Sequence, residues 1–570
     1  MESNALDLPE IRTLLGPHLS LASLQACVLV CKAWHNTFIR FLWATFYFGH
    51  PREINTTGSS DAPQPPERAT IEKYAHLIQD LVVIHLTPTF CLDLFRGTPL
   101  PSLKKLHLSP NINSDTMNIS HLGWIFRQNS GLRVVKYDGL QGGKRWSSYS
   151  TLDQAEEQEE EEVLALLDSC REIVDLTVRY VQFKEEYWEG FRRLCATRLR
   201  RLVFYYCKGL EGVEWEGILM PHLLELTITS GRVKGPIAAR PELRMVAQCP
   251  NLRTLRWYDD RGRDPNSSSF YQILVSCPRL EAVELQRMVL SDDEIATVLK
   301  SMVHPAREII LPTSNTTLDL PRIFGFGWKA FGALARRHLT ERLVVLDIGP
   351  MNGFVTSGQV LRVLYSCTGL REIGACRVLG REICERAQVE GMWACRGLEV
   401  FKVRVAFELS DEQFIQTQEG VFRQLSGLTR LRVLNVGTRT TTTIQQQMYS
   451  LFSKNTEESL QFKLEYGLAQ LTGLERLETL SVCSGGGGVP QKLEREDVDW
   501  MRRWWRGLKV VEGELCPKKE VNAAIGKVLT IRARWPEGHK EEAKEEERFL
   551  GMLDEVGFRR TDAAAAADAT

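Results

Sequence analysis

Cysteine is the residue type in this chain with the most chemical options, as a nucleophile, a redox centre or a zinc ligand. The 570 residues include 14 cysteines, but none forms a Cys-x-x-Cys pair and no cysteines and histidines have the spacing of a zinc site. Five occupy the same position of a recurring phrase, where a free thiol acts as a small hydrophobe: Cys170, Cys249, Cys277, Cys367 and Cys395. We therefore predict no metal site and no catalytic cysteine.

Other catalytic patterns are equally weak. The segment GFGWK at 325–329 has too few glycines for a phosphate-binding loop, and no Ser or Thr follows Lys329. A hydrolase or transferase hidden in the long segments 312–339 or 438–470 needs a nucleophile with a base, or a metal set, and neither segment supplies one. We expect a protein that is not an enzyme and that has no catalytic residues and no cofactor.

The elements that position the remaining residues come from the recurring phrase, Cys-x-x-φ-x-x-φ-x-φ, where φ is apolar. Clear copies begin at residues 170, 249, 277, 367 and 395, and looser copies at 75, 100, 129, 196, 220, 303, 340, 428, 474 and 505. Many intervals between copies are 24 to 29 residues, the period of a leucine-rich repeat. The copies predict about 13–15 repeats. No single unit buries its own apolar face, so the repeats must stack into a continuous core.

Each repeat is predicted to contain a helix, a turn and a short strand. An apolar helix face with i, i+3, i+4, i+7 spacing precedes several copies, as at Val360, Val363, Leu364 and Cys367. Capping boxes mark the expected helix starts at Ser291–Glu294, Thr356–Gln359 and Ser410–Gln413. The fold class is α/β, a curved solenoid with parallel strands on its concave face and helices on its convex face.

Side chains alternate along each predicted strand, so one set faces the core and the other lines the concave face. In NLRTLRWY at 251–258, Leu252, Leu255 and Trp257 point inward. Arginine and tyrosine are favoured at protein-binding hot spots. We therefore predict substrate-binding roles for the Arg and Tyr residues that alternation places on the concave face: Arg179, Arg201, Tyr205, Arg256, Tyr258 and Arg404. Whether the arginines read phosphate or only complement a protein surface stays open.

The N-terminal segment 8–43, LPEIRTLLGPHLSLASLQACVLVCKAWHNTFIRFLW, carries more apolar surface than so short a stretch can bury. It predicts three short helices, the first interrupted at Gly16-Pro17. Chains below about 40 residues rarely fold without help, so the uncovered surface indicates a partner. A small bundle that only caps the first repeat is the alternative.

This segment resembles an F-box over its full length, most specifically in Val30-Cys31-Lys32-Ala33-Trp34. The repeats are similar to those of F-box leucine-rich-repeat proteins of the fungal type. The resemblance implies a substrate receptor of an SCF-type cullin-RING ubiquitin ligase, in which the F-box docks on a Skp-family adaptor and the repeats hold an unknown target protein. It assigns adaptor docking, or support of the docking helices, to Leu8, Pro9, Ile11, Leu15, Leu19, Leu24, Val30, Cys31 and Trp34. A leucine-rich-repeat scaffold without a ligase role is the alternative.

The predicted domains are an F-box at 1–50, a linker at 51–70 and a solenoid at 71–540. Insertions are expected near 141–162, 312–339 and 438–470, and a C-terminal helix and disordered tail at 541–570. A formal net charge of −1 argues against nucleic-acid binding, and no apolar run approaches the ~20 residues of a membrane span. The N-terminus lacks a secretory signal, so we expect a reduced protein in the cytoplasm, the nucleus or both.

Overall fold

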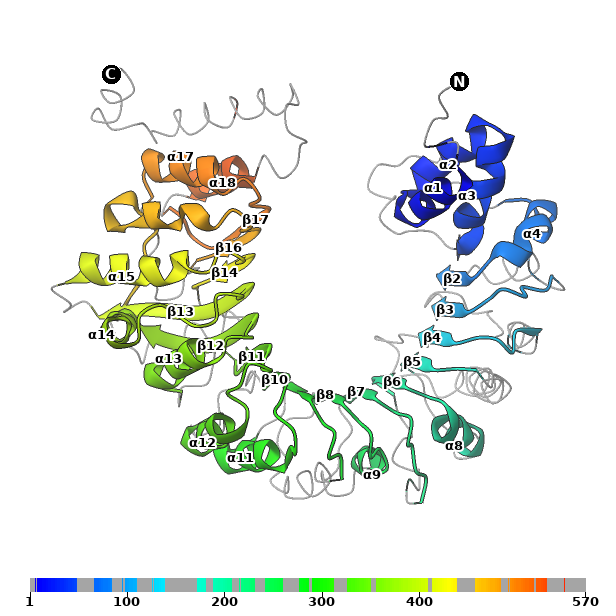
Figure 1. Cartoon of the computed structure of the whole chain (residues 1–570), viewed down its shortest axis with the longest axis horizontal. Coiled ribbons are helices and arrows are strands. Elements are labelled where there is room, and N and C mark those ends of the chain that lie inside the picture. The colour runs from blue at the N-terminus through cyan, green and yellow to red at the C-terminus, as the bar shows by residue number, and fades with distance from the viewer. Residues whose placement is uncertain are drawn as a thin grey trace, which may run out of the picture. The chain divides into compact units, whose positions relative to one another are not determined.

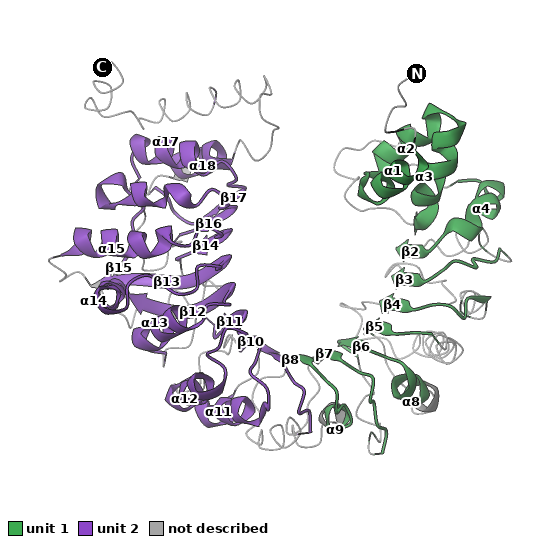
Figure 2. Cartoon of the chain, viewed as in Figure 1, with its two compact units in different colours: residues 1–261 green, residues 262–570 purple. Residues whose placement is uncertain are grey.

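The computed structural model divides the chain into two compact units, residues 1–261 and 262–570 (Figure 2). The sequence did not predict this division. The residues that the structure describes are 6, 8–48, 66–84, 95, 98–109, 126, 128–138, 172–180, 188–207, 215, 217–230, 241–259, 276–286, 290–311, 325–349, 355–408, 413–437, 457–482, 491, 493–516, 519–530 and 548.

The first unit begins with a helical head, which consists of α1 (Pro9–Leu15), the 3-10 turn η2 (Gly16–His18), α2 (Leu21–Val30) and α3 (Lys32–Ala44). Pro9 occupies the first turn of α1, where its missing N–H costs nothing. Ser20 caps α2 by accepting a hydrogen bond from the Ser23 amide at 3.2 Å. Gly16 is buried against the ring of Phe41, which a Cβ at this position would displace.

The parallel sheet starts directly after the head, earlier than expected. Strand β1 (Thr45–Phe48) follows α3 without a break and pairs with β2 (Asp80–Ile84) from Thr45↔Asp80 to Phe48↔Val83. The sheet therefore begins before residue 71, the predicted start of the array, because α3 runs directly into β1. Residues 40–48 fit the phrase loosely, with Trp43, Phe46 and Phe48 at its apolar positions. Residues 51–65 of the expected linker lie outside the described residues, and α4 (Arg68–Tyr74) and η4 (Ala75–Leu77) then lead into β2.

The sheet of the first unit continues strand by strand in chain order, with every neighbouring pair parallel. Two described helices, α8 (Trp188–Thr197) and α9 (Pro241–Ala247), lie on one side of it (Figure 1). The strands after β2 are β3 (Lys105–Ser109), β4 (Val134–Asp138), β5 (Asp175–Arg179), β6 (Arg201–Tyr205), β7 (Glu225–Ser230) and β8 (Thr254–Asp259).

The second unit repeats this arrangement, with helices along one side of a parallel sheet (Figure 1). Its parallel strands, in order, are β9 (Ala282–Gln286), β10 (Glu308–Ile310), β11 (Val345–Asp347), β12 (Glu372–Leu379), β13 (Val400–Glu408), β14 (Val433–Asn435), β16 (Thr479–Ser481) and β17 (Val510–Glu512). Its helices are α11 (Asp292–Ser301), α12 (Trp328–Arg337), α13 (Ser357–Ser366), α14 (Gly380–Glu390), α15 (Phe414–Ser426), α17 (Arg495–Trp504) and α18 (Lys519–Thr530). Strand β15 (Glu457–Ser459) pairs antiparallel with the end of β13.

The predicted α/β leucine-rich-repeat solenoid is confirmed, and the position of each predicted strand agrees with the structure. Every predicted copy, including the weak one at 303, is followed by a strand that starts five residues later. Alternation holds as expected, since Leu252 and Leu255 are 0% exposed and Trp257 is 1% exposed. The repeat cysteines Cys249, Cys277, Cys367 and Cys395 are all 0% exposed, whereas Cys170 lies outside the described residues.

Two segments that were predicted as insertions contain regular elements in their described parts. Within 312–339, the described residues 325–337 include a regular repeat helix, α12, with Phe326 and Phe331 in the core. Within 438–470, the described residues from 457 onward form β15, η9 (Leu464–Tyr466) and part of η10 (Leu468–Gly473), and Leu460 and Phe462 are buried. The insertion at 141–162 lies outside the described residues, as does 541–570 except for Arg548.

Two of the three predicted capping boxes are present, at Ser291–Glu294 and Thr356–Gln359. The third is wrong, because α15 begins at Phe414 and Gln413 is its N-cap rather than its third residue.

Candidate protein-binding surfaces

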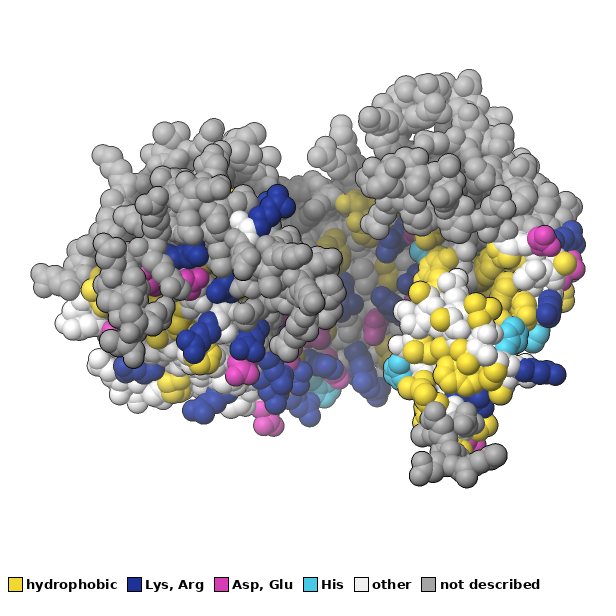
Figure 3. Space-filling model, turned by 90° about the horizontal axis from the view of Figure 1, so that it is seen from above, with side chains coloured by type: hydrophobic (Ala, Val, Ile, Leu, Met, Phe, Trp, Pro, Cys, Tyr) yellow, Lys and Arg dark blue, Asp and Glu magenta, His cyan; other side chains and the backbone are white. Residues whose placement is uncertain are grey.

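The head exposes an unusual amount of apolar surface. Only Leu24 and Phe38 are fully buried hydrophobic side chains in its helices, at 6% and 1% exposure. In the described part of the chain, seven of the fifteen exposed large hydrophobic residues belong to the first 30 positions: Leu6, Leu8, Leu14, Leu15, Leu21, Leu29 and Val30. Figure 3 shows hydrophobic side chains gathered over this N-terminal part, on the right of the view. Contiguous apolar exposure of this kind marks an interaction site.

The predicted adaptor-docking residues divide into two groups by exposure. Those that face outward are Leu8, Pro9, Leu15, Val30 and Cys31. Ile11, Leu19 and Trp34 are half-buried and Leu24 is buried, so this group supports the helices that carry the others. Trp34 belongs to the internal packing, since its ring lies 5.4 Å from that of Phe38.

Sequence reasoning missed three of the most exposed head residues. Leu14, Leu21 and Leu29 are 67%, 61% and 85% exposed, and none of them was assigned to docking. For Leu21 and Leu29, both on α2, the exposed side could not be predicted, because α2 is apolar on nearly every side and its sequence marks no single face.

The strand face of the first unit is defined by the side chains at the first, third and fifth positions of its strands, which register aligns into three rows. In the first row each cation is ion-paired with a carboxylate of a neighbouring strand. Lys105 Nζ lies 2.9 Å from Asp80, and Arg201 bridges Asp175 at 3.2 Å and Glu225 at 3.5 Å. The predicted binding residue Arg201 is therefore already held by two carboxylates.

The second row carries positive charge and no carboxylate. From β2 to β8 it reads Val82, His107, Lys136, Thr177, Val203, Thr227 and Arg256. Lys136 is exposed and the predicted Arg256 is half-buried. The His107 imidazole reaches toward the third row, where its Nε2 lies 3.2 Å from the Asp138 carboxylate.

The third row brings together three of the predicted residues. From β4 to β8 it reads Asp138, Arg179, Tyr205, Thr229 and Tyr258. The guanidinium of Arg179 lies 3.4 Å from Asp138 and 5.4 Å from the centre of the Tyr205 ring, a cation–π geometry. Tyr205 and Tyr258 are half-buried, so each presents part of its ring outward.

The remaining predicted residue, Arg404, lies on β13 in the second unit. Register places it opposite Arg377 of β12, beyond a bulge between Ala375 and Arg377. It does not share a row with the other predicted residues, all of which belong to the first unit.

Two tyrosines that the sequence did not single out lie beside the third row. Tyr180 and Tyr206 directly follow β5 and β6, and both adopt left-handed backbone conformations, with φ of 56° and 52°. Among the described residues outside glycine, these are the two positive φ values. The rings of Tyr180, Tyr205 and Tyr206 pack together, with centroids 4.7 to 5.7 Å apart. Alternation alone predicts strand residues only, so this cluster could not be read from the repeat phrase.

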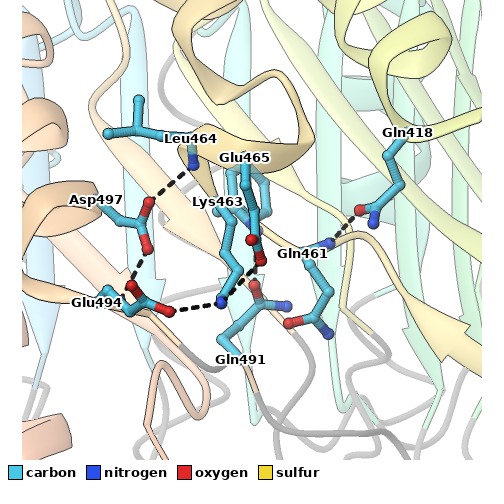
Figure 4. Close-up of polar contacts among 9 residues, drawn as sticks. Gln418, Gln461, Lys463, Leu464, Glu465, Gln491, Glu494 and Asp497 are labelled. Carbon is cyan, nitrogen blue, oxygen red and sulfur yellow. Dashed lines mark hydrogen bonds and ion pairs between the residues drawn. The ribbon is translucent and has the colours of Figure 1, made fainter. Parts of the chain in front are cut away.

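A charged cluster in the second unit resembles an acid–base site, but its side chains pair with one another and with backbone amides (Figure 4). Lys463 Nζ lies 2.9 Å from Glu494 and 3.0 Å from Glu465. Burial opposes its charge, but these two hydrogen bonds raise the pKa of Lys463 overall. Asp497 accepts from the amides of Leu464 and Glu494, both at 2.8 Å, although burial raises its pKa.

Buried glutamines clamp the backbone beside that cluster (Figure 4). The Gln418 side chain accepts from the Gln461 amide at 2.7 Å. Gln491 accepts from the Phe462 amide at 2.9 Å and donates to the Leu460 carbonyl at 2.8 Å. The irregular segment between β15 and η9 thus obtains side-chain partners in place of a helix or sheet ladder.

The buried thiols have no sign of reactivity. Burial raises the pKa of Cys367 to about 11 and those of Cys277 and Cys395 to about 12, so the thiolate is strongly disfavoured. No group of three or more His, Cys, Asp or Glu side chains in the described ranges could hold a metal ion. No helix among the described residues is long and apolar enough to cross a bilayer.

No protein-family model matches the chain, and no curated protein matches it. Among solved structures, it is similar to the leucine-rich-repeat protein LegL7 from Legionella pneumophila, at 12% identity over 61% of this chain and 97% of that one, with a TM-score of 0.30. It is also similar to the complex of Rad7 and Elc1 in yeast, at 12% identity over 78% and 88%, with a TM-score of 0.37. The plant peptide hormone receptor RGFR1 in complex with RGF2 matches at 11% identity over 81% and 74%, with a TM-score of 0.30. Identities this low concern the fold alone.

Proposed function

We propose that this chain is the substrate-recognition subunit of an SCF-type cullin-RING ubiquitin ligase and has no catalytic role of its own. The head docks on a Skp-family adaptor, which connects it to the cullin and its RING subunit. The strand face holds the target protein within reach of the ubiquitin-loaded enzyme. The mechanism is positional, since holding two reactants together raises their effective concentration.

The observation that carries the proposal is the uncovered apolar surface of the head. Leu8, Leu29 and Val30 are 48%, 85% and 61% exposed, and two of them match F-box positions. A bundle that served only to cap the first repeat needs apolar contacts toward that repeat and has no use for leucines that face outward. The contact toward the array comes from Trp43, which stacks on Tyr74 with ring centroids 4.9 Å apart, and from Phe46, which lies edge-on to Phe95 at 5.5 Å.

The test is binding of the purified full chain to a Skp-family adaptor. The variant Leu29→Arg places a charge on the exposed apolar surface, and Val389→Arg makes the same change at an equally exposed position on α14. We expect stoichiometric binding by the wild type and by Val389→Arg, and a loss of at least about thirtyfold in affinity for Leu29→Arg, because hot-spot changes cost about 2 kcal/mol or more.

Leu8→Arg should behave like Leu29→Arg. Trp34→Ala is a poor test, because loss of the Trp34 ring damages the packing around Phe38. If wild-type protein with an intact melting transition binds no adaptor, the ligase proposal fails and the chain is a leucine-rich-repeat scaffold with another partner.

A further inference from the structure

We propose that the second and third rows of the first unit's strand face bind an acidic segment of a partner protein in an extended conformation. This inference rests on the proposed function only in naming the target's chemistry, because the peptide binding described below is measured without any adaptor. The site consists of Lys136, Arg179 and Arg256 together with the tyrosine cluster, which we define as Tyr180, Tyr205 and Tyr206.

Charge is the first argument. In the two rows the permanently charged groups are three cations, Lys136, Arg179 and Arg256, against the single carboxylate of Asp138. That carboxylate is shared between Arg179 and His107. In the first row the carboxylates Asp80, Asp175 and Glu225 outnumber the cations Lys105 and Arg201. Among these described strand positions, cations outnumber carboxylates only in the second and third rows taken together, and this balance fits an anionic ligand.

Spacing decides which anion fits. Lys136 lies on β4, Arg179 on β5 and Arg256 on β8, and register makes these strands successive neighbours through β6 and β7. Four strand spacings of about 4.8 Å separate the outer cations by about 19 Å. One phosphate group needs cations that converge on it. Cations spread over this length match carboxylates distributed along about six residues of extended peptide, at about 3.3 Å per residue.

Backbone strain in the tyrosine cluster is the second, independent argument. A left-handed conformation is unfavourable for any residue with a Cβ, and bulky residues adopt it rarely. Here the conformation is fixed at two equivalent positions, because the Tyr180 amide donates to the Tyr205 carbonyl at 2.8 Å and the Tyr206 amide donates to the Thr229 carbonyl at 2.7 Å. Strain held in place by surrounding structure concentrates at functional sites.

The strain has a geometric result. It brings the Tyr180 and Tyr206 rings into a stacked pair with an interplanar angle of 19° and sets both edge-on to Tyr205. All three tyrosines are half-buried, so the cluster is a rigid platform between the cations rather than part of the core. A platform of this kind contacts the backbone and apolar side chains of an extended peptide at little cost in conformational entropy.

Single-stranded nucleic acid also combines negative charge with groups that stack on tyrosine. The first row disfavours it, because its three carboxylates, Asp80, Asp175 and Glu225, outnumber its two cations beside the basic rows on the same face. A phosphate backbone beside these carboxylates is repelled, whereas a peptide needs only the width of the two basic rows. We therefore assign the surface to a peptide.

The test uses the full-length chain and fluorescence anisotropy. The probe is a labelled peptide of about seven residues with glutamates at alternate positions between leucine and proline, and the matched peptide has glutamine in place of every glutamate. We expect the glutamate peptide to bind at least about tenfold more tightly than the glutamine peptide. The double variant Lys136→Glu/Arg179→Glu should lose that preference, whereas Arg193→Glu/Arg244→Glu, with the same charge change on the helices α8 and α9, should keep it.

The tyrosine variants separate binding from folding. In Tyr180→Gly/Tyr206→Gly, glycine accepts the left-handed backbone without strain, and this gain offsets the lost ring contacts. We expect a melting temperature close to that of the wild type with peptide affinity reduced about tenfold. A large drop in melting temperature with unchanged affinity would assign the rings to stability alone and overturn their binding role.

Three further outcomes overturn the proposal. They are equal binding of both peptides, no binding of the glutamate peptide to the wild type, and tighter binding of a single-stranded RNA oligonucleotide that depends on Lys136 and Arg179. The adaptor assay above reports on the head and uses no peptide. A chain that binds the adaptor but not the peptide refutes only this inference, and one that binds the peptide but not the adaptor refutes only the ligase role.

Discussion

At the scale of single residues, Asp347 on β11 shows how the strand face of the second unit holds charge at a cost. Burial raises the pKa of the Asp347 carboxyl, and nearby Glu372 and Glu284 raise it further. The Gly349 amide, which donates to Oδ1 at 2.9 Å, and Lys402 act in the opposite direction. Across the ladder, Gly374 makes room for this carboxylate, which lies 2.5 Å from where a Cβ would stand.

The variant Asp347→Asn keeps the acceptor for Gly349 and removes the charge. Because the folded pKa of Asp347 is raised above its ordinary value of 3.8, ionisation opposes folding as the pH rises through and above that value. We expect Asp347→Asn to melt at a higher temperature than the wild type at neutral pH, with the difference vanishing in acid. Thermal melts across pH, with the exposed Glu385→Gln as control, check this. A gap that is the same at every pH would mean that desolvation of the charge is not its source.

Residue by residue, the sequence predicted what depends on alternation within a strand. Leu252, Leu255 and Trp257 are buried as expected. It did not predict the tyrosines at 180 and 206, because their position depends on a backbone conformation that no residue preference favours. Nor did it predict that Arg201 is held between two carboxylates, because that depends on the register of three strands.

At the scale of elements, α12 explains why part of a repeat looked like an insertion. Its N-terminus has glycine as N-cap and no side-chain cap of its own. The cap comes instead from Asp292 on the preceding helix, whose carboxylate accepts from the amides of Gly327, Lys329 and Ala330 at 2.8 to 2.9 Å. A start signal supplied from 35 or more residues away cannot be read from the local sequence.

Removal of this distant cap should destabilise α12 selectively. Asp292→Ala leaves three amides without their acceptor, and the loss of an N-cap costs about 0.5–2 kcal/mol. The neighbour Asp293 is 70% exposed and pairs only at the surface with Lys329, so Asp293→Ala should change stability little. Hydrogen exchange should show faster exchange across Trp328–Arg337 in the first variant and not in the second. Equal effects of the two substitutions would show that surface charge, rather than capping, matters here.

At the scale of the whole chain, β1 covers the edge of β2 and is itself the first strand of the first unit's sheet. An unpaired edge strand is a template for association with another chain, and β1 covers β2 along Asp80–Val83. Deletion of residues 1–48 should therefore leave β2 unpaired and cause concentration-dependent self-association, measured by light scattering. Deletion of residues 1–5 is the matched control. A deleted chain that stays monomeric at all concentrations would show that the array does not need the head as a cap.

The positions of the repeat strands could be predicted from the sequence, because the repeats share one phrase and a strand follows each predicted copy of it. The division into two units was not, since it depends on the density of contacts between repeats and not on the phrase. The start of the sheet was also missed, because α3, a helix of the head, runs directly into β1.

Because α3 passes directly into β1, the number of repeats sets the distance between the head and the tyrosine cluster. The head and the tyrosine cluster belong to one compact unit, and no free joint separates the last head helix from the first strand. Each strand between them adds about 4.8 Å. A repeat gained or lost between β1 and β5 would therefore change the distance between the proposed adaptor on the head and the proposed peptide on the strand face by that fixed increment.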